Sequence, residues 1–316
     1  MRNLTLAALP FLALGACNGD KEPEETGQDT ASVDVFGNLI NATEPILTED
    51  ADADDLTCWT AGEAWLTETP VADCQIDAAV SGVLKDFETD DPVEAATVEI
   101  FLEDTIPEGT AADQSATTDI SGNVSFPDPI PTCSPFTYRA STDPARDETI
   151  VTIDAHQVLP PVDTQEGEFQ SVSTATYAII PSLLGVSVDD TKGAAAGTAY
   201  DCNGDPIEGA QVIVRDTDGN YPESQVVRYF ERDFPVRDRT TTSADGLWVI
   251  LNVNEGRGNV VELYGVLEAG EAPVLLATSP VDVFADSLNI SSTSFGYGDG
   301  VVYPPACLSP TCTDDR

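Results

Sequence analysis

Apolar and polar residues alternate with a period of two in two stretches of the chain, at 96–102 and 210–214. In the first stretch this alternation puts Val98 and Ile100 on one buried face of an extended strand. A turn rich in Asp, Asn, Gly and Pro precedes each stretch, and these residues preset or tolerate the backbone angles of a chain reversal. The pattern therefore predicts two β-hairpins in equivalent settings.

The two hairpins belong to an internal repeat. Residues 82–100 read GVLKDFETDDPVEAATVEI, and residues 197–214 read GTAYDCNGDPIEGAQVIV. A second matching segment follows each of them, because Thr118-x-x-x-Gly122 aligns with Thr242-x-x-x-Gly246. The spacing from the Asp-Pro proline to this glycine is 30 residues in the first copy and 40 in the second. The second copy therefore carries an insertion of about ten residues.

The combined pattern, G-x-V-x-D, then DPV-x-x-A-x-V, then T-x-x-x-G-x-(Y/W/F), resembles the carboxypeptidase regulatory-like domain. This domain is a transthyretin-like seven-stranded sandwich found in many bacterial surface proteins. The second copy matches better, because it has Gly204 and Gly209 where the first has an aspartate and Ala95. The resemblance covers roughly two thirds of the chain and implies a fold. It implies no catalytic residue, since the matched positions are turn glycines and apolar strand positions.

We expect an all-β protein with two tandem Greek-key sandwiches, transthyretin-like or immunoglobulin-like. The first spans 79–181, with strands near 79–84, 94–102, 122–127, 136–142, 148–153 and 172–180. A linker at 182–193 leads to the second, at 194–296, and a cysteine-containing tail follows at 297–316. Residues 33–78, with two of the three tryptophans, are predicted to be a disulfide-pinned cap on the first sandwich.

The N-terminus reads as an export and anchoring signal. Residues 1–16 carry Arg2 and then an apolar run that is too short to span a bilayer. The run ends Leu14-Gly15-Ala16-Cys17, which resembles the bacterial lipobox and implies a lipid on Cys17; the alternative is an ordinary secretory signal with a chance cysteine. Asn18 favours the outer membrane by resemblance to known sorting rules. Residues 17–32 are polar and acidic, and they are predicted to be a disordered tether.

The cysteine count suits an exported protein. Apart from Cys17 the chain has six, an even number, which predicts three disulfides. Spacing suggests Cys58 with Cys74 and Cys307 with Cys312, which leaves Cys133 with Cys202. Zinc is a poor alternative, because there is no C-x-x-C and only one histidine.

The formal net charge of −43 argues against nucleic acid and anionic lipid as partners. Asp50, Asp52 and Asp54 alternate as in the opening of a calcium loop. The sequence then departs from that motif, which favours a solvated acidic loop and leaves calcium as the alternative. A similar run at 216–220 is equally incomplete. No other cofactor is expected.

The sequence lacks the common catalytic motifs. It has no G-x-S-x-G, no P-loop, no dinucleotide fingerprint and no H-E-x-x-H, and its one histidine, His156, has no nucleophile beside it. Paired carboxylates remain an alternative, although 56 acidic residues single out no pair. We therefore expect a protein that is not an enzyme.

The segment 215–239, around the insertion, concentrates arginines and aromatic residues, which are typical of recognition surfaces. The candidate binding residues are Arg228, Tyr229, Phe230, Arg232 and Phe234. The alternative is a long hairpin whose arginines pair with Glu231, Asp233 and Asp238.

Together these features predict a lipid-anchored cell-envelope protein, in the outer membrane or at the cell surface. It would act as a structural spacer or as a binding module for another envelope component, a protein or a glycan. A carbohydrate-binding or adhesion module is the first alternative, and a hydrolase with acidic catalytic residues is the second.

Overall fold

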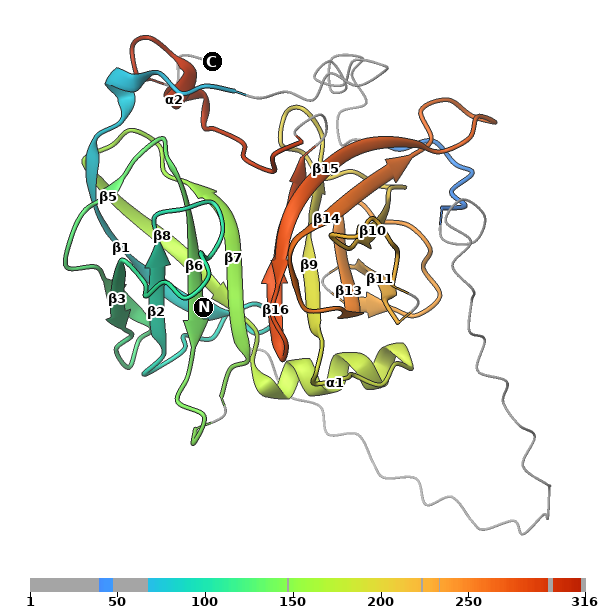
Figure 1. Cartoon of the computed structure of the whole chain (residues 1–316), viewed down its shortest axis with the longest axis horizontal. Helices are drawn as coiled ribbons and strands as arrows, with labels where there is room; N and C mark the ends of the chain where they lie inside the picture. The colour runs from blue at the N-terminus through green and yellow to red at the C-terminus, as the bar shows by residue number, and fades with distance from the viewer. Residues whose placement is uncertain are drawn as a thin grey trace, which may run out of the picture. The chain divides into compact units, whose positions relative to one another are not determined.

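The computed structural model describes residues 40–47, 68–146, 148–222, 224–232, 234–294 and 298–313. The signal, the tether, Cys58 and the aspartates at 50, 52 and 54 lie outside these ranges. Strands dominate the described part, as predicted, and they belong to one compact unit at 32–316 (Figure 1). None of its helices is long and apolar enough to cross a membrane.

The first sandwich consists of β1 to β8. Their bounds are β1 (Asp77–Asp86), β2 (Thr97–Phe101), β3 (Gln114–Thr117), β4 (Asn123–Ser125), β5 (Ile130–Pro131), β6 (Pro135–Ser141), β7 (Val151–Val158) and β8 (Thr164–Ser171). In one sheet β1 pairs with β4, β5 and, in parallel, β8; the other runs β7-β6-β2-β3. The core between them includes Leu84, Ile100 and Phe169, and Phe169 packs edge-on against Tyr138 at 5.0 Å between ring centroids.

The second sandwich consists of β9 to β17. Their bounds are β9 (Gly193–Tyr200), β10 (Gln211–Arg215), β11 (Val226–Glu231), β12 (Phe234–Val236), β13 (Leu247–Val253), β14 (Gly256–Gly265), β15 (Val274–Val283), β16 (Ser287–Ile290) and β17 (Thr293–Ser294). One sheet is β10-β14-β15, and the other contains β12-β11-β13-β9-β16. Trp248, Ile250 and Leu263 fill the core between them, each at most 1% exposed.

The repeat predicted from the sequence is present in the strand register. Gly82 of β1 lies opposite Val124 of β4, and Gly197 of β9 lies opposite Trp248 of β13. A Cβ at either glycine would lie 2.6–2.7 Å from a carbonyl oxygen of the neighbouring chain segment, so both positions require glycine. The sequence alignment therefore corresponds to a structural one.

The same side chain fastens the turn in both copies. The Ala96 N–H donates to Thr118 Oγ1 at 2.9 Å, and this hydroxyl donates to a buried carbonyl at 2.6 Å. In the second copy the Ala210 N–H and Thr242 make the same two bonds at the same distances. The motif threonine thus closes the turn onto the strand that follows it.

Glycines of the better-matching second copy occupy left-handed backbone positions. Gly204 has φ +89° and Gly209 has φ +88°. The first copy keeps this geometry without glycine, since Asp90 has φ +61° and Ala95 has φ +55°. A non-glycine residue costs more here, so the first copy carries some local strain that the second avoids.

The insertion changes the sheet to which the next strand belongs. In the first copy, β3 pairs with β2 at the edge of the β7-β6-β2-β3 sheet. In the second copy, the chain forms the hairpin β11–β12, and β11 pairs with β13 of the opposite sheet. The extra residues therefore widen one sheet of the second sandwich by two strands.

The two sandwiches share a continuous sheet. Strand β16 runs parallel to both β7 and β9 and lies between them, with Leu288 opposite Thr152 on one side and Ala194 on the other (Figure 1). The resulting ten-stranded sheet runs from β12 to β3. Backbone hydrogen bonds therefore join the two sandwiches within one compact unit, and their division into two tandem domains stays a prediction.

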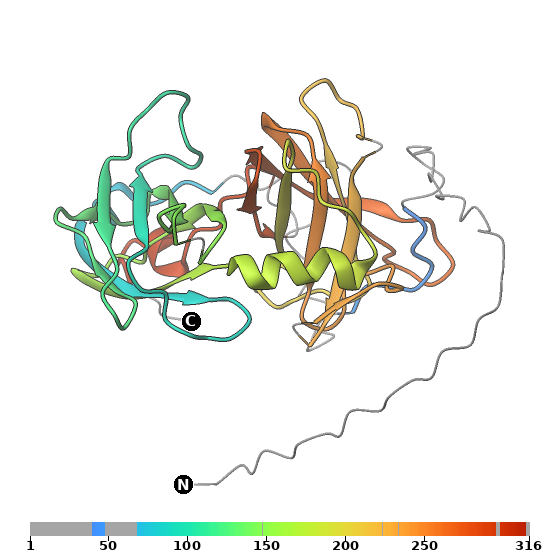
Figure 2. The same cartoon turned by 90° about the horizontal axis from the view of Figure 1, so that it is seen from below.

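The strand expected at 172–180 is wrong, because the chain forms the helix α1 (Thr174–Leu184) there. Ser173 accepts the Thr176 N–H at its start, and Gly185, with φ +68°, follows its end. The helix lies along the second sandwich (Figure 2). Its apolar residues, Tyr177 among them, pack against Phe230, Val249 and Leu251. The last strand of the first sandwich lies just before the helix, as β8.

The prediction of a cap on the first sandwich is wrong for residues 40–47. Residues 40–47 pack on the second sandwich, where the N–H of Ile46 donates to Val266 O at 2.9 Å. Leu47 exchanges two backbone hydrogen bonds with Glu208, and Ile46 joins the core. The short helix η1 (Ala72–Cys74) lies just before β1.

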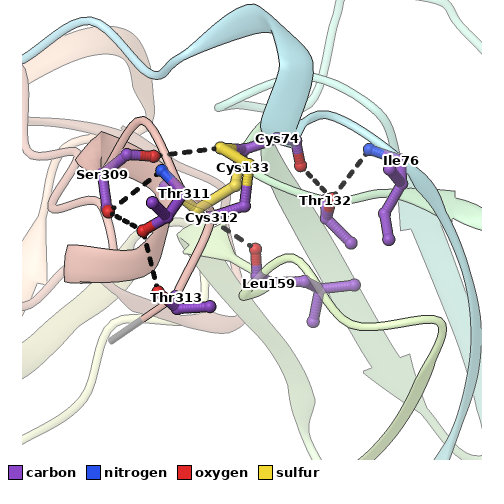
Figure 3. Close-up of a disulfide and its surroundings, with 10 residues drawn as sticks. Cys74, Ile76, Thr132, Cys133, Leu159, Ser309, Thr311, Cys312 and Thr313 are labelled. Carbon is purple, nitrogen blue, oxygen red and sulfur yellow. Dashed lines mark hydrogen bonds between the residues drawn. A yellow bond between two sulfur atoms is a disulfide. The ribbon is translucent and has the colours of Figure 1, made fainter. Parts of the chain in front are cut away.

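Disulfides hold the C-terminal tail against the first sandwich (Figure 3). Cys74 is bonded to Cys312 and Cys133 to Cys307, so the pairings suggested by spacing are wrong. Cys307 belongs to the helix α2 (Pro305–Leu308). The N–H of Val71 donates to the Cys307 carbonyl, and Thr132 Oγ1 donates to that of Cys74, so backbone groups also close this junction.

Cys202 is disulfide-bonded as well, and its partner lies outside the described residues. All the cysteines in the described ranges are therefore oxidised, as the even count predicted.

Candidate functional site

Two of the five candidate binding residues belong to the core. Tyr229 is 4% exposed, and its hydroxyl accepts the Val212 N–H at 2.9 Å. Burial raises the pKa of this hydroxyl. Phe230, its neighbour on β11, lies on the other face of the strand with the residues that α1 covers. The two aromatic residues are adjacent because successive residues of an interior strand face opposite sides of the sheet, and both sides are buried here.

Arg232 and Phe234 lie at the tip of the β11–β12 hairpin. Arg232 is exposed and has φ +53°, and Phe234 is 64% exposed. The fifth candidate, Arg228, is partly buried on β11. The structure therefore places only these three of the predicted residues where a ligand could touch them.

Arg215 belongs to a partly buried polar network around Glu262. Its Nε donates to Glu262 Oε1 at 2.6 Å, and the hydroxyls of Tyr221 and Tyr264 donate to Glu262 Oε2 at 2.7 and 2.9 Å. Burial, followed by the Glu262 charge, raises the pKa of the Tyr264 hydroxyl. This network holds β10 to β14, so Arg215 has a structural role.

Arg239 also has hydrogen-bond partners within the protein. It donates to Glu208 at 3.2 Å and to the carbonyls of Thr241 and Thr242, and it lies 3.8 Å from Glu231. The pairing with Glu231 is one of those that the hairpin alternative predicted. Asp233 lies outside the described residues.

Arg228 and Arg237 have fewer partners. Arg228 Nη1 donates to the carbonyl of Val227 at 2.7 Å, but its buried Nε has no hydrogen-bond partner in the described part of the chain. Burial lowers the pKa of the Arg228 guanidinium, Arg237 lowers it further, and Asp238 opposes both. The Arg237 guanidinium packs over Gly185 at the carboxyl end of α1, where the helix dipole favours a cation.

These arginines line a hollow of about 280 Å³ formed by residues of β10, β11 and the segment 237–240. Its lining includes Arg228, Arg237, Arg239 and Asp238, together with Gln211 and Asn41. Arg239 is already paired with Glu208, so Arg228 and Arg237 against Asp238 give the hollow a small positive balance in a chain of net charge −43. It is therefore suited to an anionic group. Sequence reasoning found the segment but did not single out Arg237.

The aspartate-containing segment 216–220 forms a turn. Asp216 Oδ1 accepts the N–H groups of Asp218 and Asn220, and Gly219 has φ +83°. These are the bonds of an Asx-type turn, in which the side chain stabilises its own backbone. Among the described residues, no group of three or more histidine, cysteine or acidic side chains could hold a metal ion.

His156 is a buried bridge between the sandwiches. It lies on β7 with φ +61° and 8% exposure, and its Nε2 is 2.9 Å from the carbonyl oxygen of Pro280 on β15. Gly300 lies against its ring, so there is no room there for a larger residue. This placement is that of a core histidine and not of a general base.

Comparisons with known proteins provide no family. No protein-family profile matches the sequence, and no curated protein sequence matches it. The resemblance to the carboxypeptidase regulatory-like domain therefore stays a prediction.

Several solved structures align with this chain at low scores. The shaft pilin SpaA of Lactobacillus rhamnosus GG aligns over 70% of this chain and 98% of its own, with 10% identity and a TM-score of 0.22. A minor pilin of Streptococcus agalactiae aligns over 72% and 98%, with 14% identity and a TM-score of 0.19. The major pilin subunit BcpA of Bacillus cereus aligns over 70% and 100%, with 8% identity and a TM-score of 0.19. These scores are too low to support an argument.

Proposed function

We propose that this chain is a non-enzymatic protein of the cell envelope, held to a membrane by a lipid on Cys17, in which two joined sandwiches act as a stiff spacer. The observation that supports it most is the position of β16 between β7 and β9. A strand shared by two sandwiches resists bending between them, because bending would break a row of buried backbone hydrogen bonds. A hinged linker would give no such resistance.

The disulfides add to this stiffness. Cys74–Cys312 and Cys133–Cys307 close loops of 238 and 174 residues, so the C-terminal tail is fastened to the first sandwich. Both loops contain the whole second sandwich. Covalent closure of this kind suits an exported protein that must keep its shape outside the cell.

The anchor is tested by fractionating cells that express the full chain. Cys17→Ser should move the protein from the detergent-extracted membrane fraction to the soluble fraction. Asn18→Asp is the matched control, since it changes the sorting residue but keeps the lipidated cysteine, so this variant should stay with membranes. If Cys17→Ser still partitions with membranes, the lipid anchor is wrong.

The hollow formed by Arg228, Arg237 and Arg239 supports a second function, recognition of an acidic envelope glycan. Guanidinium groups bind carboxylate and sulfate oxygens in pairs, and a buried Nε without a partner has a free donor to offer. A neutral glycan would leave this charge without a counterpart.

Binding to dextran sulfate and to neutral dextran tests this function. The wild type should bind only the sulfated polymer, and the binding should weaken as salt rises. Arg228→Gln and Arg237→Gln should each weaken it several-fold, whereas Arg232→Gln removes the same charge at the exposed hairpin tip and should have little effect. Equal effects of the three variants would show a response to net charge and would contradict a site in the hollow.

A further inference from the structure

A second hollow lies where α1 and the end of β8 meet the shared sheet, opposite in character to the arginine hollow. Its volume is about 190 Å³, and apolar side chains form most of its wall. Ile180 of α1, Leu251 of β13 and Leu288 of β16 are among them, and Phe230 of β11 is another. An apolar cavity of about 150 Å³ can hold a benzene molecule, so this one has room for a ligand of somewhat greater size.

Two strong hydrogen-bond acceptors, Asp154 and Gln170, line this cavity beside several hydroxyl groups and the indole N–H of Trp248. Asp154 of β7 is one of the lining residues, and no lysine, arginine or histidine is among them. Gln157 Nε2 donates to Asp154 Oδ1 at 2.9 Å, and no lysine, arginine or histidine of the described chain forms an ion pair with this carboxyl group. A carboxyl group thus lies in an apolar cavity without a positive partner.

Gln170 supplies a second acceptor. It lines the same cavity, and its Oε1 is buried without a hydrogen-bond partner among the residues that the structure describes. Its Nε2 donates to Glu168 Oε1 at 2.6 Å, so the oxygen is the end of the amide that has no partner. A buried carbonyl oxygen without a donor costs free energy that a bound donor would recover.

We propose that this cavity binds a small organic ammonium ligand, with its apolar body among the side chains of α1 and the shared sheet and its N–H groups directed to Asp154 and Gln170. An ammonium group carries several donors and one positive charge, so it can satisfy both acceptors and neutralise the carboxylate. An alcohol of the same shape has one donor and no charge. The apolar wall would contact an amine and an alcohol of the same shape equally well, so Asp154 and Gln170 should make the cavity bind the amine more tightly.

Burial raises the pKa of Asp154 to about 7, although hydrogen bonds from Tyr138 and Gln157 lower it. The carboxyl group thus ionises only at a cost in the empty cavity. A bound ammonium group offsets that cost, because an opposite charge at close range favours the ionised form. The inference is independent of the spacer function and of the arginine hollow.

Calorimetric titration with benzylamine and benzyl alcohol tests the proposal, because the two ligands share a ring and differ in charge. The probes are added to the folded, disulfide-bonded protein at pH 8 in 0.5 M sodium chloride, which screens the acidic surface. The wild type should bind benzylamine at least tenfold more tightly than benzyl alcohol. Equal affinities would contradict the roles of Asp154 and Gln170.

Variants then locate the binding. Asp154→Asn should weaken benzylamine binding at least tenfold, and Gln170→Leu should weaken it several-fold. Asp218→Asn, which removes the same charge from an exposed turn, should leave it unchanged. Equal binding by Asp154→Asn and the wild type would overturn the proposal.

Ala196→Leu is a second kind of variant, which keeps Asp154 but fills the cavity from β9. It should abolish binding of both probes, and it keeps the proposal testable if Asp154→Asn does not fold. Unchanged benzylamine affinity in a folded Ala196→Leu variant would show that the amine binds elsewhere, and the proposal would then be wrong.

Discussion

Replacing the motif threonine with valine, once in each copy of the repeat, should destabilise the protein by the same amount. Thr118→Val removes the hydroxyl that accepts the Ala96 N–H at 2.9 Å and donates to Val93 O at 2.6 Å. Thr242→Val removes the equivalent bonds to Ala210 and Ile207, at the same distances. Thr118 is 4% exposed and Thr242 is fully buried, so water cannot replace either hydroxyl.

Each variant leaves one buried N–H and one buried carbonyl oxygen without a side-chain partner. Each such group costs about 1–3 kcal/mol, and the apolar methyl group of valine recovers a small part, so we expect a loss of about 2–4 kcal/mol per variant. In a protein of this size that corresponds to a fall in Tm of about 5–12 °C. Urea unfolding followed by circular dichroism provides the free energies, and the midpoints are compared at a constant m-value.

Two controls complete this experiment. Thr→Ser at each position keeps the hydroxyl and should recover most of the stability. The double Thr→Val variant should lose the sum of the two single losses, because the two turns share no partner. A loss below about 1 kcal/mol in either copy, or losses that differ twofold between copies, would refute the structural equivalence of the turns.

Other predictions follow from the disulfides, the buried carboxyl group and the surface charge. Cys74→Ser with Cys312→Ser should lower the free energy of unfolding by about 3–5 kcal/mol, because the bond closes a 238-residue loop; a change below 1 kcal/mol in urea unfolding would contradict this. The pKa of Asp154 is about 7 in the folded state against an ordinary 3.8, so the folded state retains this proton longer. The wild type should therefore lose stability relative to Asp154→Asn as the pH rises from about 4 to about 7, and a constant difference in Tm across that window would rule it out. With a net charge of −43, Tm should rise between dilute buffer and 1 M sodium chloride. If Asp50, Asp52 and Asp54 bind calcium, Tm should rise further when calcium is added at matched ionic strength. An unchanged Tm would favour the solvated loop instead.

The repeat could be predicted from the sequence because its positions are fixed by local physics. Gly82 and Gly197 are required by a close backbone approach, and Thr118 and Thr242 by the turn that each one closes. Such positions tolerate few residue types, so both copies keep the same spacing. The neighbouring alternation of apolar residues then indicates the strands.

The helix α1 and strand β8 were missed because their patterns are weak. The strand sequence TQEGEFQS is almost entirely polar, since β8 lies at the edge of its sheet and pairs only with β1. The helix contains a compact run of apolar residues that suits a buried strand equally well. Only the spacing of Tyr177, Ile180 and Leu184, which face the second sandwich, distinguishes the helix.

The disulfides and the shared sheet depend on contacts between distant parts of the chain. Cys307 and Cys312 are close in sequence but bond to residues that precede and lie within the first sandwich. Likewise, nothing in the four residues of β16 indicates that they pair with β7, more than 130 positions earlier. Sequence patterns describe single strands well, whereas these long-range pairings follow from the packing of the whole fold.

The candidate site illustrates the same limit. Tyr229 and Phe230 attracted interest because they are aromatic and lie beside arginines, yet both are core residues. Asp154 drew no interest among 56 acidic residues, and its environment became evident only from the cavity around it. Residue type indicated which groups could act, while burial determined which of them are available.

The central claim is that β16 joins the two sandwiches into one stiff body, and a distance measurement by pulsed electron spin resonance tests it most directly. Spin labels are attached to ketone-bearing amino acids introduced at Ile120, which is 78% exposed in the first sandwich, and at Glu271, in an exposed loop of the second. This labelling leaves the disulfides intact. The account predicts a single narrow distance distribution, with a width set by the labels themselves. A broad or two-peaked distribution would show that the sandwiches move relative to each other, and it would contradict the shared sheet and the spacer function together.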